Sequence, residues 1–404
     1  MTADGAGDPP DQLLGPEIRA GVERLLADAW GAPVALVAAE PLADRAHVVR
    51  VTTADGRSAV VKRPGDGPRG RWGAASHGIA VERAGLEHLA AMPGAPVPAL
   101  LGGDGNLAVI VLEDLAVERT MAGSLLGADP ERAWADVVAL GAALGAVHGW
   151  SIGRADAFAA LRAAHGVARP DRTWWGDVFR AERAPFVDAL DRLGLGGTTT
   201  ASLEGELDAL DTALAGGRWR GFVHGDPCPD NAVVAAGRVR LLDLERCSPG
   251  SIALDAAYLL APFPSCWCFG RVPQDLAGAG LAAHRRAVAD HGIMLGDGWD
   301  VAVAAALGAW VVIRGSQAAE SVDDTGRAEV WGTTTMRPRL LAWADAFVTA
   351  AAARDAFPRL HAVATALRDR LRTAWPDEEV PHYPPFAPPG GALAARPEGW
   401  TPAG

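Results

Sequence analysis

Three side chains suited to phosphoryl transfer lie close together in one turn-rich stretch. Asp226 and Asn231 are five residues apart between two short apolar runs, and Asp243 follows Asn231 by twelve residues. Transfer of a phosphoryl group from ATP to a hydroxyl needs a carboxylate that accepts or orients the hydroxyl proton, and oxygen ligands that hold Mg2+ over the phosphates. Asp226, Asn231 and Asp243 supply these groups at the spacing of a kinase catalytic loop.

The single lysine of the chain is a further functional candidate. Of the 37 basic residues, 36 are Arg and one, Lys62, is Lys. A compact ammonium that donates to a phosphate cannot be replaced by a planar guanidinium. We therefore expect Lys62 to bind phosphate.

The pattern H-G-D-x-x-x-x-N from His224 to Asn231, followed by D-x-E at Asp243, resembles the aminoglycoside phosphotransferase and choline kinase family, over about residues 30–350. The resemblance implies an α+β, protein-kinase-like fold with two lobes. It makes Asp226 the catalytic base, Asn231 and Asp243 the magnesium ligands, and His224 a support of the loop. It also implies that Lys62 contacts the α- and β-phosphates.

The resemblance extends to the other parts of a nucleotide site. Glu82 lies in the helix that pairs with the lysine, although Glu87 of the same helix is an alternative. Residues 112–115, with Glu113 and Leu115, correspond to the hinge that contacts adenine through its backbone. Residues 42–47 depart from kinases because they contain no glycine; Arg45 there could donate to the γ-phosphate or be simply solvated.

The elements that position these residues can be read from the sequence. Residues 16–30 have helical periodicity, and residues 48–52 and 58–61 are β-branched runs joined by an Asp-Gly turn. A helix is expected at 79–92 and a strand at 107–112. Later residues are mainly helical, as in 131–150, except for short strands at 221–224, 232–235 and 239–242.

We therefore predict four regions. Residues 1–15 form a disordered tail, 16–115 a nucleotide-binding lobe, 116–375 a catalytic and substrate-binding lobe, and 376–404 a Pro-rich extended tail.

Composition limits the classes of protein. The longest apolar runs are shorter than the roughly 20 residues of a membrane span, and the first dozen residues have no apolar segment of a signal peptide, so we expect a cytoplasmic protein. A net charge of −12 excludes a nucleic-acid partner and suits a cationic small substrate. Without a secretion signal, the four cysteines are expected to be reduced. The oligomeric state is left open.

Other candidates have a structural reading as well as a functional one. His148 is expected in the core or at a helix cap. Trp174 and Trp175 are either pocket walls or core residues. Asp323 and Asp324 could attract an ammonium group or be hydrated surface charges.

The sequence thus predicts transfer of the ATP γ-phosphate, with Mg2+, to a hydroxyl of an aminoglycoside, an amino sugar or a choline-like alcohol. Two rival classes are a catalytically silent nucleotide-binding module and a metal-dependent phosphohydrolase. Intact Lys62, Asp226, Asn231 and Asp243 argue against the first, and the second would not need Lys62 or a hinge strand.

Overall fold

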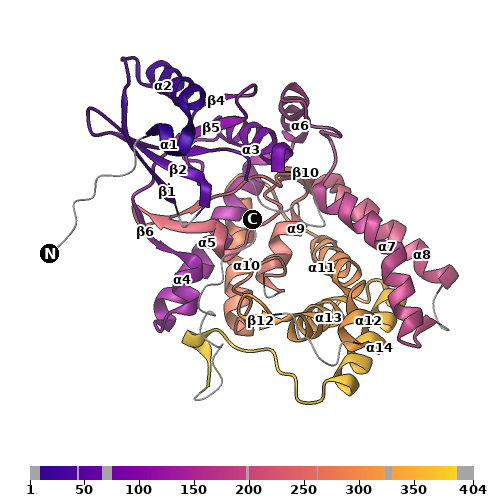
Figure 1. The fold of residues 1–404 in the computed structure, drawn as a ribbon. Coiled ribbons are helices and arrows are strands. Elements are labelled where there is room, and N and C mark those ends of the chain that lie inside the picture. Colours follow the sequence, from indigo (N-terminus) through magenta and orange to yellow (C-terminus); the bar gives the residue numbers. More distant parts are fainter. Residues whose placement is uncertain are drawn as a thin grey trace.

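The computed structural model describes residues 10–42, 45–65, 75–196, 200–261, 263–323 and 330–388. An antiparallel sheet with two flanking helices lies at one end of the molecule, and a larger helical part forms the rest (Figure 1). This mixed α+β architecture agrees with the fold class predicted from the sequence.

The five-stranded sheet has the order β1-β2-β3-β5-β4, with all neighbours antiparallel. Its strands are β1 (Leu36–Leu42), β2 (Arg45–Thr53), β3 (Ser58–Lys62), β4 (Leu100–Asp104) and β5 (Val109–Glu113). The predicted hairpin joins β2 and β3, and Gly56 in its turn has φ 81°, which glycine adopts without strain. Strand β3 is central, so Lys62 at its end is held on both sides, by pairing with Val48 and Ile110.

Two helices cover this sheet. Helix α2 (Pro16–Trp30) has the predicted bounds, whereas α3 (Ala75–Leu89) begins and ends a few residues earlier than expected. Alternate residues of β2 and β3, among them Val49, Val51 and Val61, are fully buried in one small core with Val22 and Leu26 of α2.

The prediction that residues 1–15 form a disordered tail is wrong for the last part of that range. Residues Pro10–Leu14 form helix α1, and Leu14 is 3% exposed in the core beneath the sheet. The physical reason is the apolar pair Leu13 and Leu14, which gains from burial against neighbouring apolar side chains. Residues 1–9 lie outside the described part.

Short strands flank the residues of the candidate site. Strands β6 (Val117–Thr120), β8 (Ala232–Ala235) and β9 (Arg238–Leu241) form one sheet, and β7 (Arg220–Val223) pairs with β10 (Ser248–Ser251). The predicted strands at 221–224, 232–235 and 239–242 therefore exist, within one residue at each end. Residues 224–231 connect β7 to β8.

The helical part surrounds these strands. Helices α5 and α10 pack closely because Gly141 and Gly145 of α5 face the backbone of Gly280 and His284, with no room for a Cβ. The α-helices of this part are α4 (Met121–Leu126), α5 (Pro130–Ser151), α6 (Ala155–Ala164), α7 (Trp174–Arg192), α8 (Thr200–Ala215), α9 (Ala253–Ala256), α10 (Gln274–Ala289), α11 (Trp299–Gly315), α12 (Ala318–Asp323), α13 (Met336–Ala352) and α14 (Pro358–Ala374).

The Pro-rich C-terminal region is more firmly packed than an extended surface tail. The Arg271 N–H donates to the Pro381 carbonyl at 2.7 Å, and the Tyr383 side chain is fully buried. Residues 389–404 lie outside the described part. Within the described ranges no single helix is long and apolar enough to cross a membrane; α5 and α6 pass that test only as a pair, bent by 89°.

Candidate active site

The loop between β7 and β8 brings Asp226 and Asn231 together. The Asn231 side-chain amide donates to the Asp226 carbonyl at 3.0 Å, and the Cys228 N–H donates to the same carbonyl at 2.7 Å. Gly225 has φ 83°, and a Cβ there would lie 2.6 Å from the Arg246 carbonyl. Only glycine therefore fits the turn that presents Asp226.

Two buried side chains, His224 and Asp255, hold the backbone of this loop in place. The His224 ring accepts from the Asp226 N–H at 3.2 Å through Nδ1, so its Nε2–H donates to the Leu242 carbonyl at 3.0 Å. Asp255, fully buried on α9, accepts from the backbone N–H groups of His224 and Gly225 at 2.6 and 3.0 Å. With both ring nitrogens bound to backbone, His224 supports the loop.

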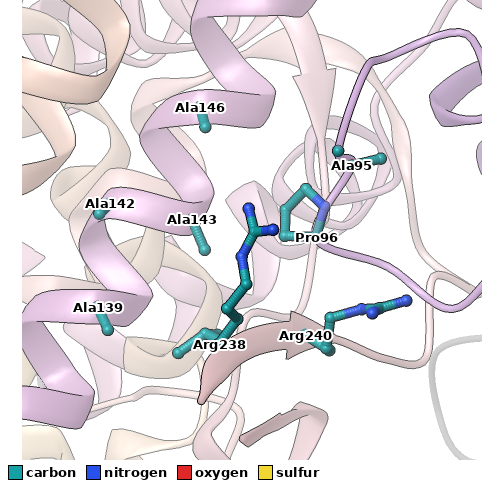
Figure 2. A pocket seen from close by; sticks show the side chains of 10 residues that line it. Ala95, Pro96, Ala139, Ala142, Ala143, Ala146, Arg238 and Arg240 are labelled. Atoms are coloured by element: carbon teal, nitrogen blue, oxygen red, sulfur yellow. The ribbon is translucent and has the colours of Figure 1, made fainter. Parts of the chain in front are cut away.

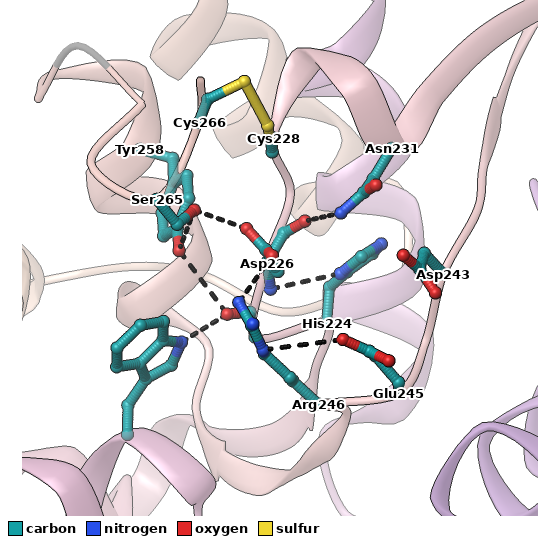
Figure 3. A network of polar contacts seen from close by, with 12 residues as sticks. His224, Asp226, Cys228, Asn231, Asp243, Glu245, Arg246, Tyr258, Ser265 and Cys266 are labelled. Carbon is teal, nitrogen blue, oxygen red and sulfur yellow. Dashed lines mark hydrogen bonds and ion pairs between the residues drawn. A yellow bond between two sulfur atoms is a disulfide. The ribbon is translucent and has the colours of Figure 1, made fainter. Parts of the chain in front are cut away.

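Two side chains hold the Asp226 carboxylate (Figure 3). The Arg246 Nη1 donates to its Oδ2 at 2.7 Å, and the Ser265 hydroxyl donates to its Oδ1. Burial raises the pKa of Asp226, while the Arg246 charge and the Ser265 hydrogen bond oppose that rise. The Asp226 side chain is 14% exposed, so part of it remains accessible from outside.

Asp243 follows β9 and lies near Asn231. The Leu242 N–H donates to the Asn231 carbonyl at 2.8 Å. This places Asp243 beside residues 224–231, named the catalytic loop for their predicted role, on the same side of Asp226 as Asn231 (Figure 3). Asp243 adopts φ 61°, a left-handed conformation that Asp tolerates better than most residues. After this turn the chain runs beside α3, where Cys247 contacts the Val81 carbonyl, and then enters β10.

These two residues suit Mg2+. Asn231 donates through its Nδ2, so its carbonyl oxygen remains an acceptor, and Asp243 adds a carboxylate. Such hard oxygen donors are the ligands Mg2+ prefers. Within the described residues, no group of three or more His, Cys, Asp or Glu side chains could hold a metal. An ion held by Asn231 and Asp243 would therefore take its remaining ligands from phosphate and water oxygens, as Mg2+ commonly does.

Lys62 links the sheet to this loop. Its ammonium donates to Glu82 Oε2 of α3 at 2.6 Å and also to Asp243 Oδ1. Burial favours the neutral amine, but the charges of Asp243 and Glu82 outweigh it and raise the pKa of Lys62. The Lys62 side chain is 13% exposed, so its ammonium is surrounded mainly by protein groups and by little water.

The choice between two glutamates is settled in favour of Glu82. Glu87 instead accepts from Arg83 at 2.9 Å and from His165 at 2.7 Å, on another face of α3. Glu82 is 2% exposed, and burial raises its pKa while Lys62 opposes that rise.

Glu245, the last acid of the D-x-E pattern, completes an acidic group around Lys62. The charge of Asp243, followed by burial, raises the pKa of Glu245 to about 7. Its side chain is 42% exposed, which means that water moderates this effect.

The predicted hinge residues lie at the end of β5. The Glu113 carboxylate accepts from the Ala99 N–H at 3.0 Å and from Arg240 at 2.8 Å, so the side chain has a structural role. The Leu115 carbonyl accepts from the Val117 N–H, whereas no described group accepts from the Leu115 N–H. That donor is consistent with an adenine contact, which stays a prediction.

A cavity of about 340 Å3 lies between α5, β9 and the loop around Pro96 (Figure 2). Its walls are alanines of α5, the loop around Pro96, and Arg238. None of the predicted site residues lines it.

The weaker candidates divide as follows. Trp175 is core and donates its indole N–H to the Gly225 carbonyl, whereas the Trp174 ring lies 4.8 Å under the Arg246 guanidinium. His148 is fully buried as expected, 3.1 Å from Asp255. Asp323 pairs with Arg192 at the surface. Asp324, residues 43–44 and the side chain of Arg45 lie outside what the structure describes.

The prediction that all cysteines are reduced is wrong. Cys228 of the catalytic loop and Cys266 form a disulfide, with their Cα atoms 5.4 Å apart, while Cys247 and Cys268 are free and buried. The sequence argument used the length of the chain and the absence of a secretion signal. Pairing depends on Cα separation and Cβ direction, which the sequence does not give.

Sequence reasoning missed three residues that hold the loop: Asp255, Arg246 and Ser265. A signal existed for Asp255, because a carboxylate within the apolar run from Ile252 to Leu260 must find buried donors. Arg246 follows Glu245 directly and could have been considered with it. Nothing in the sequence marks Ser265.

A comparison with known protein families identifies the family of this chain. The family model described as "Phosphotransferase enzyme family" matches residues 39–294, which is more than half of the chain. The chain therefore belongs to the phosphotransferase enzyme family. This confirms the family resemblance, the fold class and the prediction of a small-molecule phosphotransferase that acts on a hydroxyl group.

Solved structures are similar at low identity. A protein from Ralstonia eutropha JMP134, provisionally assigned as an aminoglycoside phosphotransferase, is 17% identical with a TM-score of 0.49, over 88% of this chain and 98% of that one. A macrolide 2′-phosphotransferase from Brachybacterium faecium is 19% identical with a TM-score of 0.41, over 77% and 93%. A choline kinase from Streptococcus pneumoniae is 12% identical with a TM-score of 0.43, over 87% and 99%. No curated protein matches the sequence.

Proposed function

We propose that this protein transfers the γ-phosphate of ATP, with Mg2+, to a hydroxyl of a small, polar, cationic molecule such as an aminoglycoside, an amino sugar or a choline-like alcohol. One observation carries the proposal. The single lysine, a buried glutamate and Asp243 are in direct contact beside the loop that presents Asp226 and Asn231. These residues come from β3, from α3 and from the stretch of residues 226–243.

Each residue has a role that its surroundings support. Lys62, held by Glu82, can donate to the phosphates of ATP when the nucleotide displaces its contact with Asp243. Asn231 and Asp243 would hold Mg2+, which neutralises charge on the phosphate oxygens. Asp226 would accept or orient the proton of the acceptor hydroxyl. The Leu115 N–H and the Glu113 backbone would contact adenine.

The two rival classes fit these contacts less well. A silent nucleotide-binding module has no use for the two donors that hold Asp226 at its carboxylate oxygens. A metal-dependent phosphohydrolase has no use for Lys62 in contact with Glu82. A cationic acceptor is supported by the net charge of −12.

The proposal is tested in two steps. The melting temperature is measured with ATP, with Mg2+ and with both, because a ligand that binds the folded state raises it. ADP release is then followed with a panel of aminoglycosides, amino sugars and amino alcohols. Stabilisation by Mg–ATP without acceptor-dependent ADP release would favour the silent module. Release of inorganic phosphate without acceptor would favour the phosphohydrolase.

The cytoplasmic location stays a prediction. The disulfide is the one observation against it, since strongly reducing compartments disfavour disulfides. Cell fractionation with detection of the protein decides the point.

A further inference from the structure

A disulfide ties a second segment of the chain to the catalytic loop. Cys228 lies two residues after Asp226, and its partner Cys266 directly follows Ser265 (Figure 3). Both cysteines are buried, at 4% and 1% exposure. The bond therefore joins the segment that carries Asp226 to the segment that carries Ser265, at the point where these two side chains meet.

The Ser265 hydroxyl is one of the two groups that orient the Asp226 carboxylate. Ser265 donates to Oδ1 and Arg246 donates to Oδ2, so the two oxygens are held from two different segments. The Tyr258 hydroxyl lies 3.1 Å from the Ser265 hydroxyl oxygen, within hydrogen-bond distance. The terminal torsion of an Asp side chain is broad when nothing restrains it, so both donors are needed to fix the carboxylate plane.

The backbone of Cys266 is held by groups outside the catalytic loop. The Cys266 N–H donates to Phe263 and the Cys266 carbonyl accepts from Arg339 at 2.7 Å, and neither partner belongs to the loop. The disulfide is the covalent link that keeps Ser265 at Asp226.

The neighbouring thiol does not open this link readily. The Cys268 sulfur lies 2.9 Å from the Cys266 sulfur. However, burial raises the pKa of the Cys268 thiol to about 12, and only a thiolate attacks a disulfide. At neutral pH the bond therefore persists until an external reductant opens it.

We propose that Ser265 is a positioning residue for Asp226, and that the Cys228–Cys266 disulfide makes this positioning dependent on redox state. The oxidised chain holds the carboxylate ready for transfer, and the reduced chain turns over more slowly. A small dithiol supplies two electrons and two protons; the S–S bond breaks, two thiols form, and the dithiol becomes a cyclic disulfide. This inference rests on the proposed function.

The first experiment compares the oxidised protein with protein reduced by dithiothreitol. Reduction is verified by counting thiols after denaturation, which rise from two to all four. We expect kcat to fall about tenfold, the value of one hydrogen bond to a charged group, and KM for ATP to change little. Cys228→Ser should start at the lower kcat and not respond to dithiothreitol. Cys247→Ala, which leaves the disulfide intact, should respond as wild type does.

The second experiment tests Ser265 directly. Ser265→Ala should lower kcat about tenfold with unchanged KM for ATP, and dithiothreitol should then lower it no further. Ser265→Thr, which keeps the hydroxyl, should recover most of the loss. Melting curves verify that each variant is folded.

The outcomes separate this inference from the proposed function. Equal kcat in the two redox states, or an equal effect of dithiothreitol on Ser265→Ala, overturns the inference alone. Faster turnover after reduction also overturns it, since the disulfide would then hold Ser265 in the place of the acceptor. Absence of ATP turnover in both redox states, with every acceptor, overturns the proposed function and the inference with it.

Discussion

Replacement of the only lysine by arginine is the most direct test of the nucleotide site. The Lys62 ammonium lies between the carboxylates of Glu82 and Asp243, 2.6 Å from the former, and is 13% exposed. A guanidinium keeps the charge, but it is larger, planar and carried on a different stem. In Lys62→Arg it must push both carboxylates apart or leave the position between them.

The expected loss follows from this crowding. Extra atoms in a packed site cost about 1–3 kcal/mol, and each 1.36 kcal/mol is tenfold in rate. We therefore expect kcat/KM for ATP to fall about 10- to 100-fold in Lys62→Arg. The loss should be present at every acceptor concentration, because the proposed partner of the lysine is the nucleotide.

The assay is ADP release at varied ATP, with a melting curve for each variant. Arg83→Lys is the matched control, since Arg83 lies beside Glu82 on α3 but pairs with Glu87. This control should keep wild-type kcat/KM. A folded Lys62→Arg protein with wild-type kcat/KM for ATP would remove Lys62 from the site and refute the reasoning.

Three further predictions follow from the same contacts. Asp226→Asn should lower kcat about 10²- to 10⁴-fold while ATP affinity, measured by titration, barely changes; equal losses in both would show that its role is misassigned. If the acceptor is cationic, kcat/KM for it should fall as salt rises, because screening weakens its attraction to a chain of net charge −12; a neutral best substrate without salt dependence would contradict this. His88 is 5% exposed between aromatic rings, and burial lowers its pKa to about 4. Because the unfolded chain protonates His88 first, near pH 6.5, its contribution to the free energy of unfolding is complete above that pH and is lost as pH falls toward 4, by up to about 3 kcal/mol. Urea unfolding of wild type and His88→Phe from pH 7 to pH 4 measures this, and an equally steep loss in both would exclude His88 as the cause.

Local patterns in the sequence were enough to predict the strands around the candidate catalytic residues. Asp226, Asn231 and Asp243 are close in sequence, and the apolar runs around them are strands within one residue of their predicted ends. The hairpin before Lys62 was predictable because an Asp-Gly turn between β-branched runs is a local signal. The unique lysine was visible from composition alone.

Contacts between distant segments decided the rest. The sequence left Glu82 and Glu87 as alternatives, and only the direction of α3 against β3 selects Glu82. Asp255 and Ser265 meet the catalytic loop from segments 30 and 39 residues away from Gly225 and Asp226, respectively.

The pairing of the cysteines shows most clearly what the sequence alone does not predict. Four cysteines in a sequence allow several pairings or none. The choice of Cys228 and Cys266 follows from a Cα separation of 5.4 Å, which is fixed by how the segment after α9 folds back on the loop between β7 and β8. Residue types and spacing thus determined the chemistry available to this protein, whereas the tertiary packing determined which side chains hold Asp226 in place, because that depends on distances between segments that no local pattern encodes.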